Sequence, residues 1–273
     1  MAEIIIDISQ HNTRCGAIDW HKVKAADIRG VMIRIGWAGY EGGIADNNAL
    51  DQSLDASIRG AHAAGLDVGL YVYTYTKTPA AAKKAATECV TIAKRYPGII
   101  NLPIAFDVEE TASPCLIQQG RKGLTDTVIA FLAQVEQLGY YVVWYTYTAF
   151  ATQYLDRVRL APYDLWVADY RGNEALMQGQ LGRSDYGMWQ YIGDKGTCPG
   201  VEGPCDRNYC YKDYPKVIAA AGLNGLSKVP ADTPDYKVLY EAKRAECERL
   251  QQQLGKVQQK ANKFDRMMVI AQA

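Results

Sequence analysis

The sequence predicts an α/β fold, an irregular (β/α)5(β)3 barrel of the TIM type followed by a C-terminal helix with a coiled-coil-like pattern. Three observations support this prediction. Eight short runs of apolar, β-branched or aromatic residues recur along the chain, helical patterns separate the first five, and a polar heptad pattern begins after residue 234. Alternating strands and helices are typical of a parallel sheet covered by helices, and eight strands are enough to close it.

The expected strands are short apolar stretches such as "GVMIRIGW" and "YVVWYTYT". They cover residues 3–9, 30–37, 67–75, 102–109, 141–148, 165–170, 186–192 and 205–211. The expected helices have apolar residues at three- and four-residue spacing and cover 19–28, 48–64, 79–95, 125–138 and, more briefly, 149–159. Pro79 suits a first helical position, and Gly65 and Gly139 stand where glycine often ends a helix.

The last three strands are expected to lack connecting helices. Residues 171–185 and 193–204 are rich in glycine and show no helical pattern, so loops are expected there. The barrel should therefore consist of five strand–helix units and three further strands.

The chain is expected to have three parts: a barrel domain over residues 1–224, a linker over 225–234 and a helix over 235–273. The helix carries apolar residues on alternating three- and four-residue steps, interrupted at Lys243. These are Tyr240, Cys247, Leu250, Leu254, Val257, Ala261, Phe264 and Met268. The seam favours a homo-oligomer or a partner helix along Asp235–Met268, and the alternative is one amphipathic helix that packs back onto the barrel.

The composition excludes several classes of function. The 273 residues are 48% hydrophobic, and 30 basic residues balance 30 acidic ones. A net charge near zero gives no long-range attraction to nucleic acid or an anionic membrane, so neither is an expected partner. The opening "MAEIIIDISQHN" lacks the basic region and apolar length of a signal peptide, and no window reaches the length of a membrane span. Synthesis in the cytoplasm is therefore expected.

No cofactor or metal is expected, although a site for Mg²⁺ or Ca²⁺ made of carboxylates alone stays open. Among seven cysteines, Cys198, Cys205 and Cys210 cluster without the C-x-x-C pairing of a zinc site. The three histidines are not spaced as a ligand set. Without an export signal the thiols should be reduced, and a Cys198–Cys205 link is the alternative for a protein that works outside the cell.

Acidic residues stand at the ends of several predicted strands. In "LPIAFDVEE", Asp107 and Glu109 share one face of the strand because successive side chains alternate between faces. Asp7 closes the first strand and Asp206 opens the eighth, which is its neighbour in a closed barrel. Catalytic groups of barrel enzymes lie at the C-terminal ends of strands, so these four acids are expected to converge there, with Asp169 near the rim.

A cluster of carboxylates has consequences for protonation. Like charges repel, so at least one group should have a raised pKa and hold a proton near neutral pH. Glycoside hydrolysis requires a protonated acid beside an ionised one, and this is the expected chemistry. The alternative is a set of solvated strand-end acids. A serine hydrolase has no support, because the sequence has no G-x-S-x-G motif.

With these residues the chain resembles glycoside hydrolase family 25, the bacterial and phage muramidases also called Chalaropsis-type lysozymes. The matching pieces cover residues 4 to about 222 in the family's order: "IIIDISQHN", "GVMIRIGW", "GLYVYTYT", "IAFDVEE", "LWVADY", "MWQY" and the aspartate of "CDRNYCY". The resemblance implies an irregular barrel and cleavage of the β-1,4 bond between N-acetylmuramic acid and N-acetylglucosamine in peptidoglycan. It also implies action on the bacterial cell wall, as a phage or prophage endolysin or, alternatively, a bacterial self-lysin.

The resemblance also implies roles for the acids. Glu109 is the expected general acid, Asp107 and Asp7 its electrostatic and orienting partners, and Asp206 the other active-site carboxylate. Attack by an enzyme nucleophile and attack by the substrate's own 2-acetamido group both stay open.

Aromatic side chains are expected to line a sugar groove. Nineteen tyrosines and five tryptophans outnumber four phenylalanines, and rings with a polar handle suit a wet, partly apolar surface. The candidates are Tyr71, Tyr73, Tyr145, Trp189 and Tyr191 together with Asp169, and more weakly Tyr147 and Tyr170. Packing within the core is the alternative for each of them.

Two features depart from the family pattern. The segment "CPGVEGPCDRNYC" places cysteines around Asp206, and a single heptad helix stands where many phage members carry wall-binding repeats. A non-catalytic wall-binding or virion structural protein that retains the barrel is therefore the main alternative. A chitinase-like barrel is a second one, although the longer acidic signature of that family is absent.

Deletion of Asp235–Ala273 is expected to change the oligomeric state if the seam forms a coiled coil, because the apolar seam would be lost. Light scattering of the full and truncated chains at equal concentration measures their masses. An unchanged number of subunits would favour the helix that packs back onto the barrel.

Overall fold

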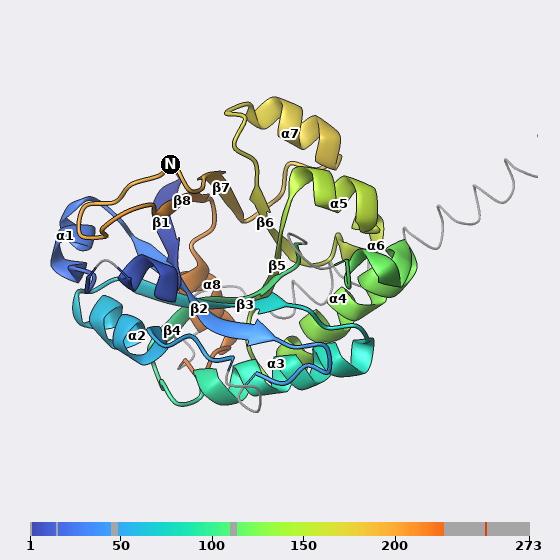
Figure 1. Ribbon diagram of the computed structural model, residues 1–273, viewed down its shortest axis with the longest axis horizontal. Coiled ribbons are helices and arrows are strands. Elements are labelled where there is room, and N and C mark those ends of the chain that lie inside the picture. The colour runs from blue at the N-terminus through green and yellow to red at the C-terminus, as the bar shows by residue number, and fades with distance from the viewer. Residues whose placement is uncertain (1, 15, 45–48, 110–113, 227–248, 250–273) are drawn as a thin grey trace, which may run out of the picture.

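A computed structural model describes residues 2–14, 16–44, 49–109, 114–226 and 249. Its eight strands form one closed barrel in chain order, with β1 next to β8 (Figure 1). They are β1 (Glu3–Ile8), β2 (Gly30–Ala38), β3 (Asp67–Thr74), β4 (Ile100–Asp107), β5 (Val142–Tyr147), β6 (Asp164–Ala168), β7 (Met188–Ile192) and β8 (Asp206–Cys210). The closed barrel confirms the predicted class for this part of the chain.

Helices follow each of the first six strands and the eighth. They are α1 (Trp20–Ala25), α2 (Leu54–Ala63), α3 (Pro79–Ala93), α4 (Gly120–Gln137), α5 (Thr148–Tyr154), α6 (Arg157–Leu160), α7 (Glu174–Leu181) and α8 (Tyr214–Ala221). Short 3-10 turns lie at Gln10–Thr13 and Ile117–Gln119. Pro79 begins α3 as predicted, and Gly65 and Gly139 have positive φ angles just after α2 and α4. None of the described helices combines the length and apolar character that a bilayer crossing requires.

One prediction that the structure overturns is the loop over residues 171–185, because it contains α7. Asn173 caps this helix by accepting the amide of Leu176, and Gly182 ends it in a left-handed conformation. Met177 and Leu181 are its buried residues, so a helix of only two turns shows a weak apolar pattern. It packs on α5 at the rim (Figure 1) and adds a sixth strand–helix unit to the five that were predicted.

Two other helical segments differ from the prediction. The expected helix over 149–159 is interrupted, because Leu155 is extended and Asp156 caps a separate helix, α6. Residues Tyr214–Ala221 form α8, for which no helix was predicted; Asp213 caps it and accepts the amide of Lys216.

Strand direction brings the start of β8 to the functional end of the barrel. Strands β1 to β7 are parallel to one another, whereas β8 is antiparallel to both β7 and β1. Antiparallel neighbours need no crossover helix, so the loop over 193–205 can join β7 to β8 directly. The start of β8 therefore lies beside the C-terminal ends of β1 to β7, and we call this end of the barrel the mouth.

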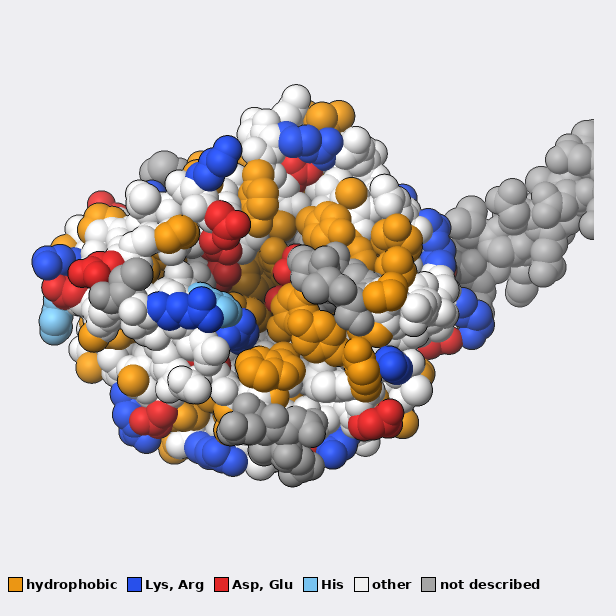
Figure 2. Space-filling model, viewed as in Figure 1, with side chains coloured by type: hydrophobic (Ala, Val, Ile, Leu, Met, Phe, Trp, Pro, Cys, Tyr) orange, Lys and Arg blue, Asp and Glu red, His pale blue; other side chains and the backbone are white. Residues whose placement is uncertain are grey.

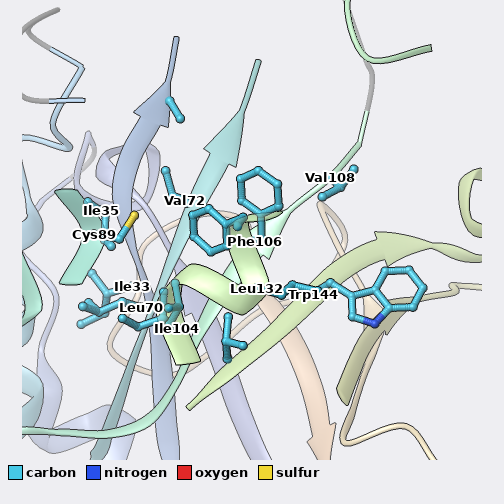
Figure 3. Close-up of a cluster of buried hydrophobic side chains, with 14 of the residues drawn as sticks. Ile33, Ile35, Leu70, Val72, Cys89, Ile104, Phe106, Val108, Leu132 and Trp144 are labelled. Carbon is cyan, nitrogen blue, oxygen red and sulfur yellow. The ribbon is translucent and has the colours of Figure 1, made fainter. Parts of the chain in front are cut away.

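Side chains of β4 alternate between two apolar layers. Ile104, Phe106 and Val108 lie in the outer layer with residues of α3 and α4 (Figure 3). Phe106 stacks on Phe131 of α4 with 3.9 Å between ring centroids. Ala105 lies in the separate cluster that fills the barrel interior. Because faces alternate, Asp107 shares the interior side with Ala105, and this side opens into the mouth.

Helix α8 closes the end of the barrel opposite the mouth. Tyr214 and Ile218 are fully buried in the interior cluster, and Leu226 packs against it. The side-chain amide of Asn224 donates to the carbonyls of Ile100 and Leu102 at the start of β4, each at 3.1 Å. Apart from Arg249, the predicted linker beyond residue 226 and the predicted helix over 235–273 lie outside the described residues.

Candidate active site

Four carboxyl groups converge at the mouth. Asp7 lies near the end of β1 and pairs with Asp206 at the start of β8. Asp107 ends β4 between Tyr73 of β3 and Tyr145 of β5, and Glu109 follows two residues later. Asp7 and Asp107 are buried, whereas Glu109 and Asp206 are partly exposed. The structure therefore brings together the four acids that the sequence singled out.

Side-chain amides hold two of these carboxylates. The Nε2 atom of Gln190 donates to Oδ2 of Asp7 at 2.9 Å and to Oδ2 of Asp206 at 3.3 Å. Asn208 donates to Oδ2 of Asp7 at 2.8 Å, and its own Oδ1 accepts from Trp166 at 2.7 Å. Asp7 is thus fixed by two donors whose orientation is set by further hydrogen bonds.

Burial raises the pKa of all four carboxyl groups. The pKa of Asp7 rises to about 6, although the amide donors lower it in part. Burial together with the charge of Asp7 raises the pKa of Glu109 to about 7 and that of Asp206 to about 8. Burial, and then the charges of Glu109 and Asp7, raise the pKa of Asp107 well above its usual value. The groups interact, so the cluster as a whole is partly protonated at neutral pH.

Arg34 adds a positive charge to the mouth. It lies on β2 opposite Tyr71, and its Nε donates to Oδ2 of Asp51 at 2.9 Å. Its charge lowers the pKa of Asp107 and so opposes the effect of burial. Nη2 of Arg34 and Oδ1 of Asp107 are both buried without a hydrogen-bond partner among the described residues. The mouth therefore keeps a donor and an acceptor for a ligand or for water.

Three predicted groove tyrosines stand at the mouth. Tyr71 contacts Trp166 edge-on, with 6.1 Å between ring centroids. Tyr73 donates its hydroxyl to the carbonyl of Glu109 at 3.2 Å, and Tyr145 donates to Oε1 of Gln190 at 2.9 Å. Figure 2 shows a hollow in this face of the molecule where acidic side chains lie among hydrophobic ones. At least two of these tyrosines therefore position polar groups of the site.

The family model described as glycosyl hydrolases family 25 matches residues 6–201, which is most of the barrel. The chain belongs to glycosyl hydrolase family 25. Asp7, Asp107 and Glu109 lie within the matched residues, and Asp206 follows five residues after the match ends. A comparison with curated proteins found no match.

Solved structures similar to this family 25 barrel include the modular autolysin LytC from Streptococcus pneumoniae. The two are 25% identical with a TM-score of 0.63, over 77% of this chain and 47% of the autolysin, so this chain matches about half of that protein. The autolysin is also known in complex with a synthetic peptidoglycan ligand. The CTP1L endolysin is 22% identical, with a TM-score of 0.62 over 79% of this chain and 69% of its own. A muramidase from Acremonium alcalophilum is 22% identical, with a TM-score of 0.62 over 80% and 98% of the two chains.

Two predicted groove residues do not reach the mouth of the family 25 barrel. Gln190 faces the interior, so its neighbours Trp189 and Tyr191 face outward. Trp189 is buried in the outer layer and donates to the carbonyl of Asp169 at 2.8 Å. Tyr191 stacks on Tyr209 with 4.3 Å between ring centroids. Both side chains pack in the barrel wall.

Asp169 lies beside the mouth and outside the carboxylate cluster. It accepts from Thr148 at 2.7 Å and forms an ion pair with Arg171. Burial raises the pKa of Asp169, but hydrogen bonds from Arg171 and Thr148 outweigh it, so the net pKa is lowered. With Tyr147 and Tyr170 it lines a hollow of about 700 Å³ next to the cluster. Tyr170 also donates to Gln190, which links this hollow to the site.

A metal site made of carboxylates alone is the alternative that the sequence leaves open. Within the described ranges, no group of three or more His, Cys, Asp or Glu side chains is arranged to hold a metal ion. Asp7 and Asp206 share the side-chain amide of Gln190.

The sequence reasoning missed Gln190, Asn208 and Arg34. Gln190 and Asn208 stand in the quoted pieces "MWQY" and "CDRNYCY", and Asn208 is two residues from Asp206, on the same face of β8. A polar side chain at an interior position of a barrel strand must be hydrogen-bonded when buried. That rule is the signal that could have identified these residues as partners of the acids.

The free energy of unfolding should fall as the pH rises from 5 to 8. The folded-state pKa values of Asp7, Glu109 and Asp206 lie above the unfolded values near 4. Their stabilising contribution is therefore complete below about pH 4 and is lost as the pH rises through about 6 to 8. In Asp206→Asn the fall should be smaller by roughly 3 kcal/mol, because a pKa of about 8 keeps this group protonated over most of that interval. Urea unfolding of both proteins at pH 5 and pH 8 measures it, and an equal fall in both would contradict a raised pKa at Asp206.

Proposed function

We propose that the chain is a peptidoglycan hydrolase that cleaves the β-1,4 bond between N-acetylmuramic acid and N-acetylglucosamine. The observation that supports this most directly is the cluster of four carboxyl groups with raised pKa values at the mouth of a family 25 barrel. Such a cluster holds a proton and a negative charge close together at neutral pH, as glycoside hydrolysis requires. The similar autolysin, which binds a peptidoglycan ligand, supports the choice of substrate.

Glu109 is the proposed general acid. Its pKa of about 7 keeps a large fraction protonated at neutral pH, and its side chain is partly exposed to an incoming sugar. The backbone around it is fixed, because Tyr73 donates to its carbonyl and Thr146 donates to the carbonyl of Val108 at 2.6 Å. The proton would pass from the Glu109 carboxyl to the glycosidic oxygen as the bond to the sugar breaks.

Asp7 and Asp107 are the proposed electrostatic partners of this acid. The charge of Asp7 raises the pKa of Glu109, so Asp7 helps to keep the acid protonated. Asp107 presents Oδ1, which has no hydrogen-bond partner among the described residues, on the same face of the strand as Glu109. A carboxylate there can stabilise positive charge on the sugar or accept the N–H of an acetamido group. Asp206, partly exposed and bridged to Asp7 by Gln190, is the fourth carboxylate of the site. These roles fit an enzyme nucleophile and substrate assistance equally.

The proposed place of action is the bacterial cell wall, with the role of an endolysin. The similarity to an autolysin and to an endolysin supports this choice. Peptidoglycan glycan strands are then the partner of the mouth.

Replacing Glu109 by Gln should lower turnover by several orders of magnitude, because the amide cannot protonate the leaving oxygen. Purified peptidoglycan is digested, reduced with borohydride and analysed by mass spectrometry for new muramitol ends. Glu3→Gln is the matched control, since Glu3 is exposed at the opposite end of the barrel, and it should be as active as the wild type. Near-normal activity of Glu109→Gln would remove it as the acid, and glucosaminitol ends would move the cut bond. A wild type that makes no new ends would point to a wall-binding protein.

The pH dependence of kcat/KM should separate the roles of Asp7 and Glu109. Activity should fall above about pH 7 as Glu109 loses its proton. In Asp7→Asn the negative charge that raises the pKa of Glu109 is absent, so the alkaline limb of the profile should move to lower pH. An alkaline limb that stays in place in the variant would show that Asp7 does not control this proton.

A further inference from the structure

The loop between β7 and β8 holds two thiols that the chemistry above does not use. Cys198 and Cys205 are 3% and 0% exposed, both are free, and each thiol affects the pKa of the other. The Cys198 thiol donates to the carbonyl of Pro199 at 3.6 Å, and the Cys205 thiol donates to the carbonyl of Asp206 at 3.8 Å. The match to the family model ends at residue 201, between the two cysteines. This pair is therefore a feature of the chain that the family match does not cover in full.

The backbone of the loop holds the two cysteines together. The amide of Val201 donates to the carbonyl of Cys198 at 3.0 Å, and the amide of Cys205 donates to the carbonyl of Gly196 at 2.9 Å. A Cβ atom at Gly196 would lie 2.2 Å from the carbonyl oxygen of Cys205, so this close approach requires glycine. A disulfide needs the two backbones near each other before the bond forms, and these contacts place Cys205 against Gly196, two residues from Cys198.

The same loop is docked beside the active site. The amide of Asp19 donates to the carbonyl of Gly200 at 2.8 Å, and the side chain of Asn12 donates to the carbonyl of Pro204 at 2.9 Å. Both anchors belong to the segment that follows β1. The loop ends at Asp206, which pairs with Asp7 of β1.

We propose that Cys198 and Cys205 are a modification site, where a disulfide forms within the loop when the protein meets a small disulfide oxidant such as glutathione disulfide. The Cys198 thiolate attacks the S–S bond of the oxidant, and one glutathione leaves as a thiolate. The Cys205 sulfur then attacks Cys198 in the mixed disulfide, and the second glutathione leaves. Two electrons pass to the oxidant, and the two cysteine protons end on two glutathione thiols.

The pKa values of the two thiols differ in the direction that attack by Cys198 before Cys205 requires. The neighbouring Cys205 side chain lowers the pKa of Cys198, so Cys198 ionises first. The Cys198 side chain, together with burial, raises the pKa of Cys205. Thr197 and Pro199 on either side of Cys198 are exposed, which gives the oxidant an approach to this end of the loop.

The disulfide closes a ring over residues 198–205 and ties down the backbone that leads into Asp206. It stabilises the fold chiefly by restricting the unfolded chain, and the expected rise in Tm is about 5 °C. The thiols stay reduced in a cytoplasm and become linked outside it. The link itself does not depend on the proposed muramidase function.

The test uses the full chain purified with a reductant, which is then exchanged for glutathione disulfide. After denaturation and alkylation with iodoacetamide, the reduced protein should carry seven added groups and the oxidised protein five. Both cysteines lie in one tryptic peptide, residues 196–207, and Cys210 lies in the next, so an internal link lowers the mass of the first peptide by about 2 Da and blocks its alkylation. A second arm unfolds the protein in urea and refolds it in the same buffer, so that slow access to buried thiols cannot hide the reaction.

Three variants complete the experiment. Cys198→Ser and Cys205→Ser should lose both the mass change and the rise in Tm, whereas Cys210→Ser should keep them. Formation of the link in either arm, reversed by reductant, supports the proposal. Full alkylation of peptide 196–207 in both arms, or a link from this peptide to another cysteine, would overturn it. A link without any rise in Tm would overturn its stabilising effect.

Discussion

The antiparallel pairing of β8 with β1 is the constraint on which the active site depends. It sets Asp206, the first residue of β8, opposite Asp7 near the end of β1. In a parallel arrangement the same residue would lie at the far end of a five-residue strand, roughly 15 Å away. β8 is also antiparallel to β7, so no crossover helix is needed between them and a loop carries the chain across this side of the mouth.

The energetics of the mouth oppose folding and favour chemistry. Four carboxyl groups buried together repel one another when they are ionised, and this repulsion costs free energy of folding. The surrounding barrel offsets some of this cost through the amides of Gln190 and Asn208 and the charge of Arg34. The part of this cost that is not offset raises the pKa values of the carboxyl groups. The proposed general acid needs such a raised pKa, because it must still be protonated near neutral pH. A site in which every carboxylate were paired with a positive charge would make the fold more stable, but it would leave no protonated carboxyl for catalysis.

Much of this fold can be predicted from the sequence, but the strands, the site acids and the strand directions differ in how well local patterns reveal them. Apolar strands of a closed barrel have a strong local pattern, so all eight strands were located within two residues of their ends. The site acids were recognisable because each lies within two residues of a strand end. Strand direction, in contrast, depends on how distant segments meet, and nothing local in "CDRNYCY" shows that β8 is reversed. Trp189 and Tyr191 were assigned to the groove by residue type, whereas the strand's alternation, fixed by Gln190, turns them into the wall.

Helix α8 gives the barrel a closed floor. Tyr214 and Ile218 fill the interior from below, and Asn224 fastens the segment to the first residues of β4. A ligand can therefore reach the interior acids only from the mouth. The two ends of the barrel are thus separate, and a fusion partner joined after Leu226 would start at the floor, on the side away from the mouth.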